Sequence, residues 1–186
     1  MSDGGRSGFT HLSICPGDAS VATLYPRSEH LGISDYIRGL RTLIGTELLL
    51  LPSATTAIFD EAGRLLLGRS VDTGRWIMIG GAIDPGESPA AAAIREAREE
   101  TGLTVGVTSL IGVYSGPDFE VMYPNGDRTL YVISLFEARP LSGTPIPDGE
   151  ELSELVYVTQ EEAFALPMAP VSRFLTERSF ARDRQY

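Results

Sequence analysis

Apolar residues recur at helical spacing early in the chain and at strand spacing over most of the remainder. The first helical set consists of Tyr36, Ile37, Leu40, Leu43 and Ile44. Ser34 or Asp35 can cap its start, so the pattern predicts a helix over residues 35–44. Residues 1–30 show neither period and are rich in Gly, Ser and Pro, which is typical of an irregular arm.

Short apolar runs in the next part of the chain predict strands. Their ranges are residues 47–51, 54–59, 65–69 and 75–79. Pro52 separates the first two runs, and residues 60–63 (DEAG) form a turn that makes the second and third runs a hairpin. The fourth run leads directly into Gly80 and Gly81.

A second helical segment comes after these glycines. Ser88 is a good N-cap, Pro89 suits the first helical position, and the alanine-rich body has high helix propensity. Gly102 stands where the residue after a helix end is expected. The pattern predicts a helix over residues 89–101.

Strand and helix signals then alternate to the end of the chain. Predicted strands cover residues 105–115, 120–123, 129–138 and 155–158. Residues 124–127 (PNGD) predict a tight turn between the second and third of them. Thr159 and Glu162 form a capping box for a helix over residues 160–166, and a last helix follows Pro170.

Composition narrows the class of protein. A chain of 186 residues with 42% hydrophobic content suits one domain. Its formal charge of −10 argues against nucleic acid as the main partner. No apolar run approaches the roughly 20 residues that span a bilayer, and no secretory leader is visible, so we expect no membrane association and a cytoplasmic location. All 15 basic residues are arginine, which excludes a Schiff-base or P-loop lysine.

Three acids crowd the helix predicted over residues 89–101. Glu96, Glu99 and Glu100 lie on one side of it, where each like-charged pair costs roughly 0.2–0.5 kcal/mol. Clustered carboxylates suit Mg²⁺ or Mn²⁺, which bridge to phosphates. Arg95 can brace Glu99 four residues later. Taken alone, the cluster is more typical of an ordinary solvated helical face than of a metal site.

The surrounding residues resemble the box of the Nudix family, with both spacers matched. The matching positions are Gly81, Glu87, Arg95, Glu96, Ala97, Glu99, Glu100, Gly102 and Leu103. The resemblance implies an α/β fold, the Nudix α/β/α sandwich with a mixed β-sheet, here with a short N-terminal helix and strand extension. The corresponding division is an arm (1–30), the extension (31–52), a Nudix hydrolase domain (53–180) and a tail (181–186). One departure is Ile79, where many members have proline before the paired glycines.

The resemblance also implies roles for the residues of the box. Glu96, Glu99 and Glu100 would ligate a divalent metal, Mg²⁺ or Mn²⁺, with a backbone carbonyl near Gly80 assisting, and Arg95 would act beside them in the catalytic set. Glu87, Gly81 and Gly102 would support the box structurally. A further acid outside the box serves as ligand or general base in many members. Our candidate is Glu150, with Glu151 close behind.

The activity implied is metal-dependent hydrolysis of a pyrophosphate bond by activated water. The substrate would be a nucleoside diphosphate linked to another moiety, such as a nucleoside triphosphate or ADP-ribose. The alternative is a nucleotide-sensing protein of the same fold with little or no catalysis. A non-hydrolytic use of the scaffold ranks last, because Cys15, His11 and His30 all lie in the arm.

Substrate contacts and assembly are less directly encoded. Candidate stacking residues are Trp76, Tyr114, Phe119, Tyr123 and Tyr131, each of which also suits a core or surface position. Candidate phosphate contacts are Arg69, Arg75 and Arg128. Pro117, some fifteen residues beyond the box, favours an ADP-ribose-type substrate within the family. The N-terminal extension predicts a homodimer.

Overall fold

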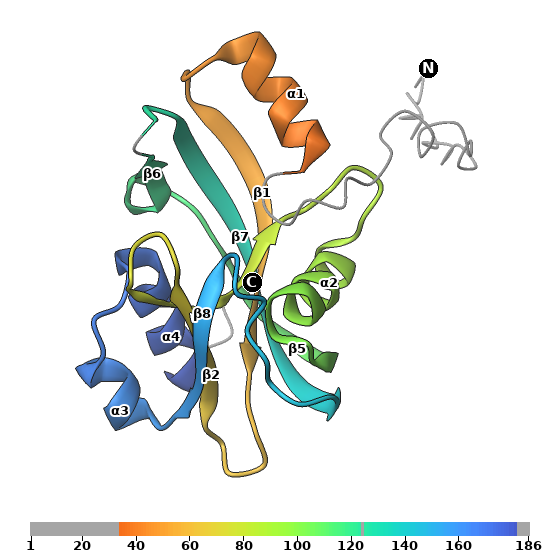
Figure 1. Cartoon of the computed structure of the whole chain (residues 1–186), viewed down its shortest axis with the longest axis vertical. Coiled ribbons are helices and arrows are strands. Elements are labelled where there is room, and N and C mark those ends of the chain that lie inside the picture. Colours follow the sequence, from red (N-terminus) through yellow and green to blue (C-terminus); the bar gives the residue numbers. More distant parts are fainter. Residues whose placement is uncertain (1–33, 124, 182–186) are drawn as a thin grey trace, which may run out of the picture.

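The computed structural model describes residues 34–123 and 125–181 (Figure 1). The predicted arm and almost all of the tail lie outside these residues. In chain order the elements are α1 (Asp35–Ile44), β1 (Leu49–Ile58), β2 (Leu65–Ser70), β3 (Trp76–Ile77), β4 (Ile79–Ala82), α2 (Pro89–Thr101), β5 (Thr104–Tyr114), the 3₁₀ turn η2 (Pro117–Phe119), β6 (Glu120–Met122), β7 (Arg128–Ser142), β8 (Leu152–Val158), α3 (Gln160–Ala165) and α4 (Pro170–Ala181).

The strands form a larger mixed sheet and a smaller antiparallel one. In the larger sheet the order is β4-β1-β7-β5, with β6 added to β7, and β1 runs parallel to β7. The smaller sheet has the order β3-β2-β8. Figure 1 shows α2 on one side of the strands and α3 and α4 on the other. The predicted α/β/α arrangement with a mixed sheet is confirmed.

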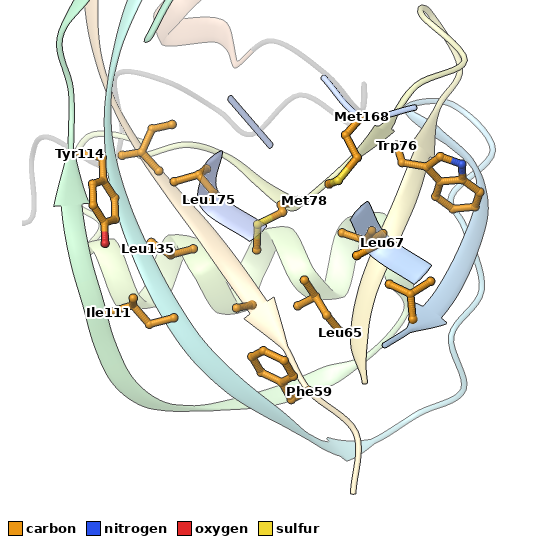
Figure 2. Close-up of a cluster of buried hydrophobic side chains, with 14 of the residues drawn as sticks. Phe59, Leu65, Leu67, Trp76, Met78, Ile111, Tyr114, Leu135, Met168 and Leu175 are labelled. Atoms are coloured by element: carbon orange, nitrogen blue, oxygen red, sulfur yellow. The ribbon is translucent and has the colours of Figure 1, made fainter. Parts of the chain in front are cut away.

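The largest group of buried apolar side chains joins the two sheets and α4. Leu65 and Leu67 of β2, Leu135 of β7 and Leu175 of α4 belong to it. Figure 2 shows these side chains directed into the space between the strands, with Phe59 at one end. This core fixes the smaller sheet against the larger one.

The helix ends follow the predicted capping residues. The hydroxyls of Ser34 and Ser88 accept hydrogen bonds from the amides of Ile37 and Ala91. Thr159 and Glu162 form the reciprocal capping box. The helices predicted over residues 35–44 and 89–101 are confirmed at both ends, and the one predicted over 160–166 ends one residue earlier, at Ala165.

The strands predicted over residues 47–51 and 54–59 are one strand, so the predicted break at Pro52 is wrong. Pro52 is paired in register with Val132 of β7, and its carbonyl accepts a hydrogen bond from the Ile83 amide on the opposite side. The nitrogen of Pro52, which carries no hydrogen, therefore faces the β4 side, beyond the last β4 pair at Ser53. The parallel ladder with β7 loses no hydrogen bond through this proline.

Two further predictions for this region are corrected. Residues 75–79 are not one strand, because Trp76–Ile77 pairs with β2 whereas Ile79–Ala82 pairs with β1 in the other sheet. The predicted hairpin is reduced to a bridge between Phe59 and Leu65, after which β2 leaves for the smaller sheet. Both errors arise because a local apolar run does not say which sheet it joins.

The last two strands are longer than predicted, whereas β5 and β6 agree with their predicted ranges to within one residue at each end. Strand β7 continues to Ser142, which pairs with Thr104 of β5. Strand β8 begins at Leu152, which pairs with Ser70 of β2. Among residues 34–123 and 125–181, none of the helices has both the length and the apolar character needed to span a membrane.

Candidate active site

The small-residue face of α2 determines where its acids lie. Ala92, Ala93 and Ala97 are fully buried, and the Thr56 hydroxyl of β1 donates a 3.1 Å hydrogen bond to the Ala93 carbonyl. Small side chains allow the helix to approach the sheet closely. The remaining faces of α2 then carry its charged side chains beside β4 and toward solvent.

Arg95 is the centre of an ion-pair network on α2. Its guanidinium donates to both carboxylate oxygens of Glu87 at 3.0 Å, to Glu96 Oε1 at 2.8 Å and to Glu99 Oε2 at 2.9 Å. It also donates to the Ala82 carbonyl of β4 at 2.9 Å. Burial alone would lower the pKa of Arg95, but its bonds to Glu87 and the charges of Glu96 and Glu99 raise that pKa above its ordinary value. Arg95 thereby ties the loop, the strand and the helix together.

Glu100 is in the opposite electrostatic situation. Its side chain is buried, and its Oε2 accepts a 3.0 Å hydrogen bond from the Gly80 amide. Among the described residues no cation forms an ion pair with it. Burial and the nearby charges of Glu96 and Glu151 raise the pKa of Glu100 well above its ordinary value. Ionised Glu100 is therefore a buried negative charge that one amide stabilises and that no cation among the described residues neutralises.

Glu96 lies between these two extremes. Burial raises its pKa to about 7 even though Arg95 lowers it, and the charges of Glu99 and Glu151 add to the increase. Glu99 has a more exposed side chain and pairs with Arg95. The three acids thus carry more negative charge than the single guanidinium neutralises.

The paired glycines allow β4 to approach its neighbours. Gly80 has φ +149°, and a Cβ there would collide with the Ala54 carbonyl of β1. A Cβ on Gly81 would lie 2.5 Å from Glu96 Oε1. Gly102 closes α2 in the left-handed region, with φ 70°. In the predicted support set, Gly81 is required for steric reasons and Gly102 for its backbone conformation. Glu87 supports the box by binding Arg95.

The loop before β8 places Glu151 among these acids. Glu150 and Glu151 are both exposed, and the amides of both donate to Asp148. Burial and the charges of Asp148 and Glu99 raise the pKa of Glu151, whose own charge raises the pKa values of Glu96 and Glu100. These charge interactions favour Glu151 over Glu150 as the carboxylate outside the box.

The donor chemistry of this site fits a hard divalent cation. Glu96, Glu99, Glu100 and the Gly80 backbone offer oxygen atoms only, and their excess negative charge is the property that such a cation would neutralise. Over the residues that the structure describes, no three His, Cys, Asp or Glu side chains converge closely enough to hold an ion. In this arrangement Arg95 binds oxygens of both Glu96 and Glu99.

The predicted substrate arginines differ in how they are engaged. Arg69 faces Glu154 at 3.6 Å, and Arg128 pairs with Glu120 at 2.7 Å. The exposed side chain of Arg75 has no hydrogen bond or ion pair with any described residue. Arg75 therefore has the guanidinium that is most available to a ligand among these three.

The predicted stacking aromatics divide into core and surface positions. Trp76 and Tyr114 are buried in the main core, as Figure 2 shows. The hydroxyls of Tyr123 and Tyr131 are 2.5 Å apart. Phe119, two residues from the predicted specificity position Pro117, lines a cavity of about 310 Å³ with Asp118, Pro170, Val171 and Phe174. Phe119 is buried in the same core as Trp76 and Tyr114, and its ring makes an edge-to-face contact with Phe174.

The comparisons with known proteins agree with the box. A family model described as the NUDIX domain matches residues 49–178. The chain belongs to the Nudix family. A Bacillus subtilis (strain 168) protein provisionally named an 8-oxo-dGTP diphosphatase is 33% identical to this Nudix chain over 106 residues, which are 57% of the chain and 64% of the relative.

A second curated relative carries a different substrate in its name. The ADP-ribose pyrophosphatase of Methanocaldococcus jannaschii is 33% identical over 104 residues, which cover 54% of this Nudix chain and 57% of the relative. In both cases the chain covers less than two thirds of the relative's length.

Solved structures support the fold of this Nudix protein. The MutT protein of Methanosarcina mazei Go1 matches with a TM-score of 0.58 at 21% identity, covering 75% of this chain and 99% of that one. An ADP-ribose pyrophosphatase of Streptococcus suis 89-1591 matches with a TM-score of 0.54 at 20% identity, covering 73% and 95%. These likenesses concern the fold alone.

Sequence reasoning missed two residues around the Nudix box. Asp148 lies in a PDG segment, a recognisable turn signal, but the distance of that turn from α2 is not readable from the sequence. Arg98 of α2 lines a cavity of about 660 Å³ together with Glu87 and Glu99, and the described residues offer its side chain no ion pair. Its helical neighbours at three and four positions are not acidic, which is the sequence signal.

Proposed function

We propose that this Nudix protein is a metal-dependent pyrophosphohydrolase. It would hydrolyse a phosphoric anhydride in a nucleoside diphosphate linked to another moiety. The observation that carries the proposal is buried Glu100, which has no cationic partner among the described residues and lies beside Glu96 within a complete box. A charge placed so unfavourably for folding is typical of a functional site.

Members of the family generally use divalent metal ions, and the donor chemistry of this chain suits Mg²⁺ or Mn²⁺. Glu96, Glu99, Glu100 and the Gly80 carbonyl would hold the ion. When bound, it would neutralise charge on the phosphates and lower the pKa of water. Arg95 keeps the loop and helix in register around these ligands. Glu151 is the carboxylate best placed to accept a proton from the attacking water.

The substrate class follows from chemistry and from the relatives. The names of the relatives include 8-oxo-dGTP and ADP-ribose, both of which contain a nucleoside joined to a pyrophosphate linkage. Arg75 supplies an available guanidinium for a phosphate. The homodimer and the cytoplasmic location stay predictions.

The alternative, a nucleotide sensor with little catalysis, predicts loss of box acids. Glu87, Glu96, Glu99 and Glu100 are all present in this chain. The hydrolase is therefore the better-supported proposal.

A substrate panel tests the proposal directly. Purified full-length protein with Mg²⁺ or Mn²⁺ is incubated with nucleoside triphosphates, ADP-ribose, nucleotide sugars, dinucleotides and NADH, and released phosphate products are measured. We expect hydrolysis of at least one compound, and loss of most of that rate in Glu99→Gln and Glu100→Gln. Glu161→Gln, an exposed acid on α3, is the matched control and should keep the full rate. Inactivity on the whole panel would instead support the sensor.

A further inference from the structure

The loop between β7 and β8 is attached to the end of α2. The amide of Ile146 donates to the Thr101 carbonyl at 2.9 Å, and the amide of Asp148 donates to the Glu100 carbonyl at 3.3 Å. These carbonyls belong to the last helical turn, where the helix itself supplies no amide donors. The loop therefore satisfies the end of the very helix that carries the acids.

The Asp148 carboxylate organises the rest of this loop. Its Oδ1 accepts hydrogen bonds from the amides of Glu150 and Glu151 at 3.2 Å and from the amide of Leu152 at 2.9 Å. Its Oδ2 accepts a second one from the Glu151 amide at 3.3 Å. Consecutive amides bound by one carboxylate form a tight, directional turn.

These contacts fix the main chain of Glu151. Its amide is bound by Asp148, its carbonyl accepts a 2.9 Å hydrogen bond from the Val71 amide, and the next residue, Leu152, begins β8 opposite Ser70. The carboxylate of Glu151 interacts electrostatically with those of Glu96, Glu99 and Glu100, so the fixed main chain keeps this charge near the acids of α2. Few alternative positions are left to this backbone.

The location of Asp148 is costly unless the turn compensates for it. Its negative charge lies near Glu100 and Glu151, and it raises the pKa values of both. Like charges close together destabilise a site. The four amide contacts are the compensating interaction visible in the structure.

We propose that Asp148 is a positioning residue that holds Glu151 against the metal-binding acids of α2. It acts through the turn geometry, not through its charge. This inference rests on the proposed hydrolase function, in which Glu151 acts on the attacking water.

Kinetics on the best substrate of the panel test the proposal. We expect Glu151→Gln to lower kcat by roughly 10²-fold or more, as for loss of a general base. Asp148→Ala should lower kcat by on the order of 10²-fold with little change in KM, because Glu151 is misplaced. Asp148→Asn keeps an oxygen acceptor and should recover most of the rate. The double variant Asp148→Ala with Glu151→Gln should be no slower than Glu151→Gln alone.

The control is Asp60→Ala, which removes a carboxylate that binds the Arg64 amide in the turn between β1 and β2. That turn lies at the end of β2 remote from Ser70, so kcat should stay unchanged. An Asp148→Asn variant as slow as Asp148→Ala would show that charge, not the turn, is what matters and would overturn the proposal. Fully multiplicative losses in the double variant would overturn it too.

Hydrogen exchange separates this inference from the proposed function. Amides of Glu150, Glu151 and Leu152 should exchange faster in Asp148→Ala than in wild type, and near wild-type rates in Asp148→Asn. Unchanged exchange in Asp148→Ala overturns the positioning role whatever the enzyme does. Inactive wild-type protein that shows the expected exchange pattern would instead refute the hydrolase and, with it, the catalytic purpose of the turn.

Discussion

Arg95 and Glu100 lie on the same helix, about one and a half turns apart. Neighbouring groups of opposite charge neutralise Arg95 but not Glu100. Arg95 reaches Glu87, Glu96, Glu99 and a β4 carbonyl at distances of 2.8–3.0 Å. Glu100 is more deeply buried, and one backbone amide is the hydrogen-bond donor recorded for its carboxylate. One side of α2 has its charges matched and the other does not.

Within this single motif, the Arg95 network favours folding, whereas ionised Glu100 opposes folding and is explained by the proposed function. The Arg95 network stabilises the loop and helix in which it lies, since every partner is a carboxylate or carbonyl that would otherwise lack this donor. Ionised Glu100 disfavours the folded state, because burial and like charges both oppose its ionisation. The contrast predicts opposite changes in stability when each charge is removed.

The largest effect is expected for Arg95→Gln. It leaves Glu87 and Glu96 partly buried without their cation, and we expect the free energy of unfolding to fall by about 3 kcal/mol. Urea denaturation measures it. Arg98→Gln removes an exposed arginine from the same helix and should change the free energy of unfolding by less than about 0.5 kcal/mol. Equal losses in the two variants would contradict the matched-network interpretation.

The next largest effect is expected for Glu100→Gln, which should raise the stability of the metal-free protein and lower its activity. The metal-free variant should unfold at a higher urea concentration than wild type, because a group with a raised pKa loses its costly charge. Its activity should fall by roughly 10²-fold or more, because a proposed metal ligand is lost. The gain in stability conferred by Mg²⁺ should also shrink.

Glu87→Gln is the comparison variant for this experiment. Glu87 binds Arg95 through both oxygens, so its neutralisation should lower the free energy of unfolding. A Glu100→Gln protein less stable than metal-free wild type would show that the Glu100 carboxylate contributes to folding, and would remove the contrast.

The smallest effect concerns pH. A carboxyl whose pKa is higher in the folded than in the unfolded protein binds protons more tightly when folded, so stability falls as pH rises between the two values. For Glu96 these values are about 7 and 4.5. The pKa of Glu100 is raised in the same direction. Metal-free wild type should therefore lose more stability than Glu100→Gln as pH rises from about 5 to about 8.

Urea denaturation in a chelator at both pH values measures this difference. The other ionisable groups are the same in both proteins, so their contributions largely cancel in the comparison. Adding Mg²⁺ should reduce the pH dependence of wild type, because a bound cation favours the ionised carboxylates. Parallel pH profiles for the two metal-free proteins would contradict the raised pKa of Glu100.

The sequence predicted helices better than strands, for a physical reason. Helix ends are set by local groups, and Ser34, Ser88 and the capping box at Thr159 act within three residues. Strand boundaries depend on partners far away in sequence. Pro52 was predicted to break a strand because nothing local shows that its missing amide hydrogen faces away from β7.

The same distinction applies to the site. The box acids and Arg95 could be proposed from their match to the Nudix box, but their partners Glu87, Ala82 and Gly80 lie outside the helix and are seen only in the structure. The choice between Glu150 and Glu151 could not be made this way, because adjacent residues differ in direction and a remote loop decides which one faces α2. Likewise, only the folded sheets show that Trp76 and Tyr114 serve the core whereas Arg75 stays available.

The attachment of the β7–β8 loop to α2 has a consequence for the tolerance of the chain to change in length. A Cβ on Gly143 would lie 2.7 Å from the Gly102 carbonyl, and the amides of Ile146 and Asp148 are bound to the two preceding residues of the helix. Surface loops ordinarily accommodate insertions at little cost. Here an added residue would shift every later contact along the helix end. The length of this loop is therefore matched to the end of α2. Insertions and tags should be better tolerated elsewhere, for example in the turn at Glu61 and Ala62.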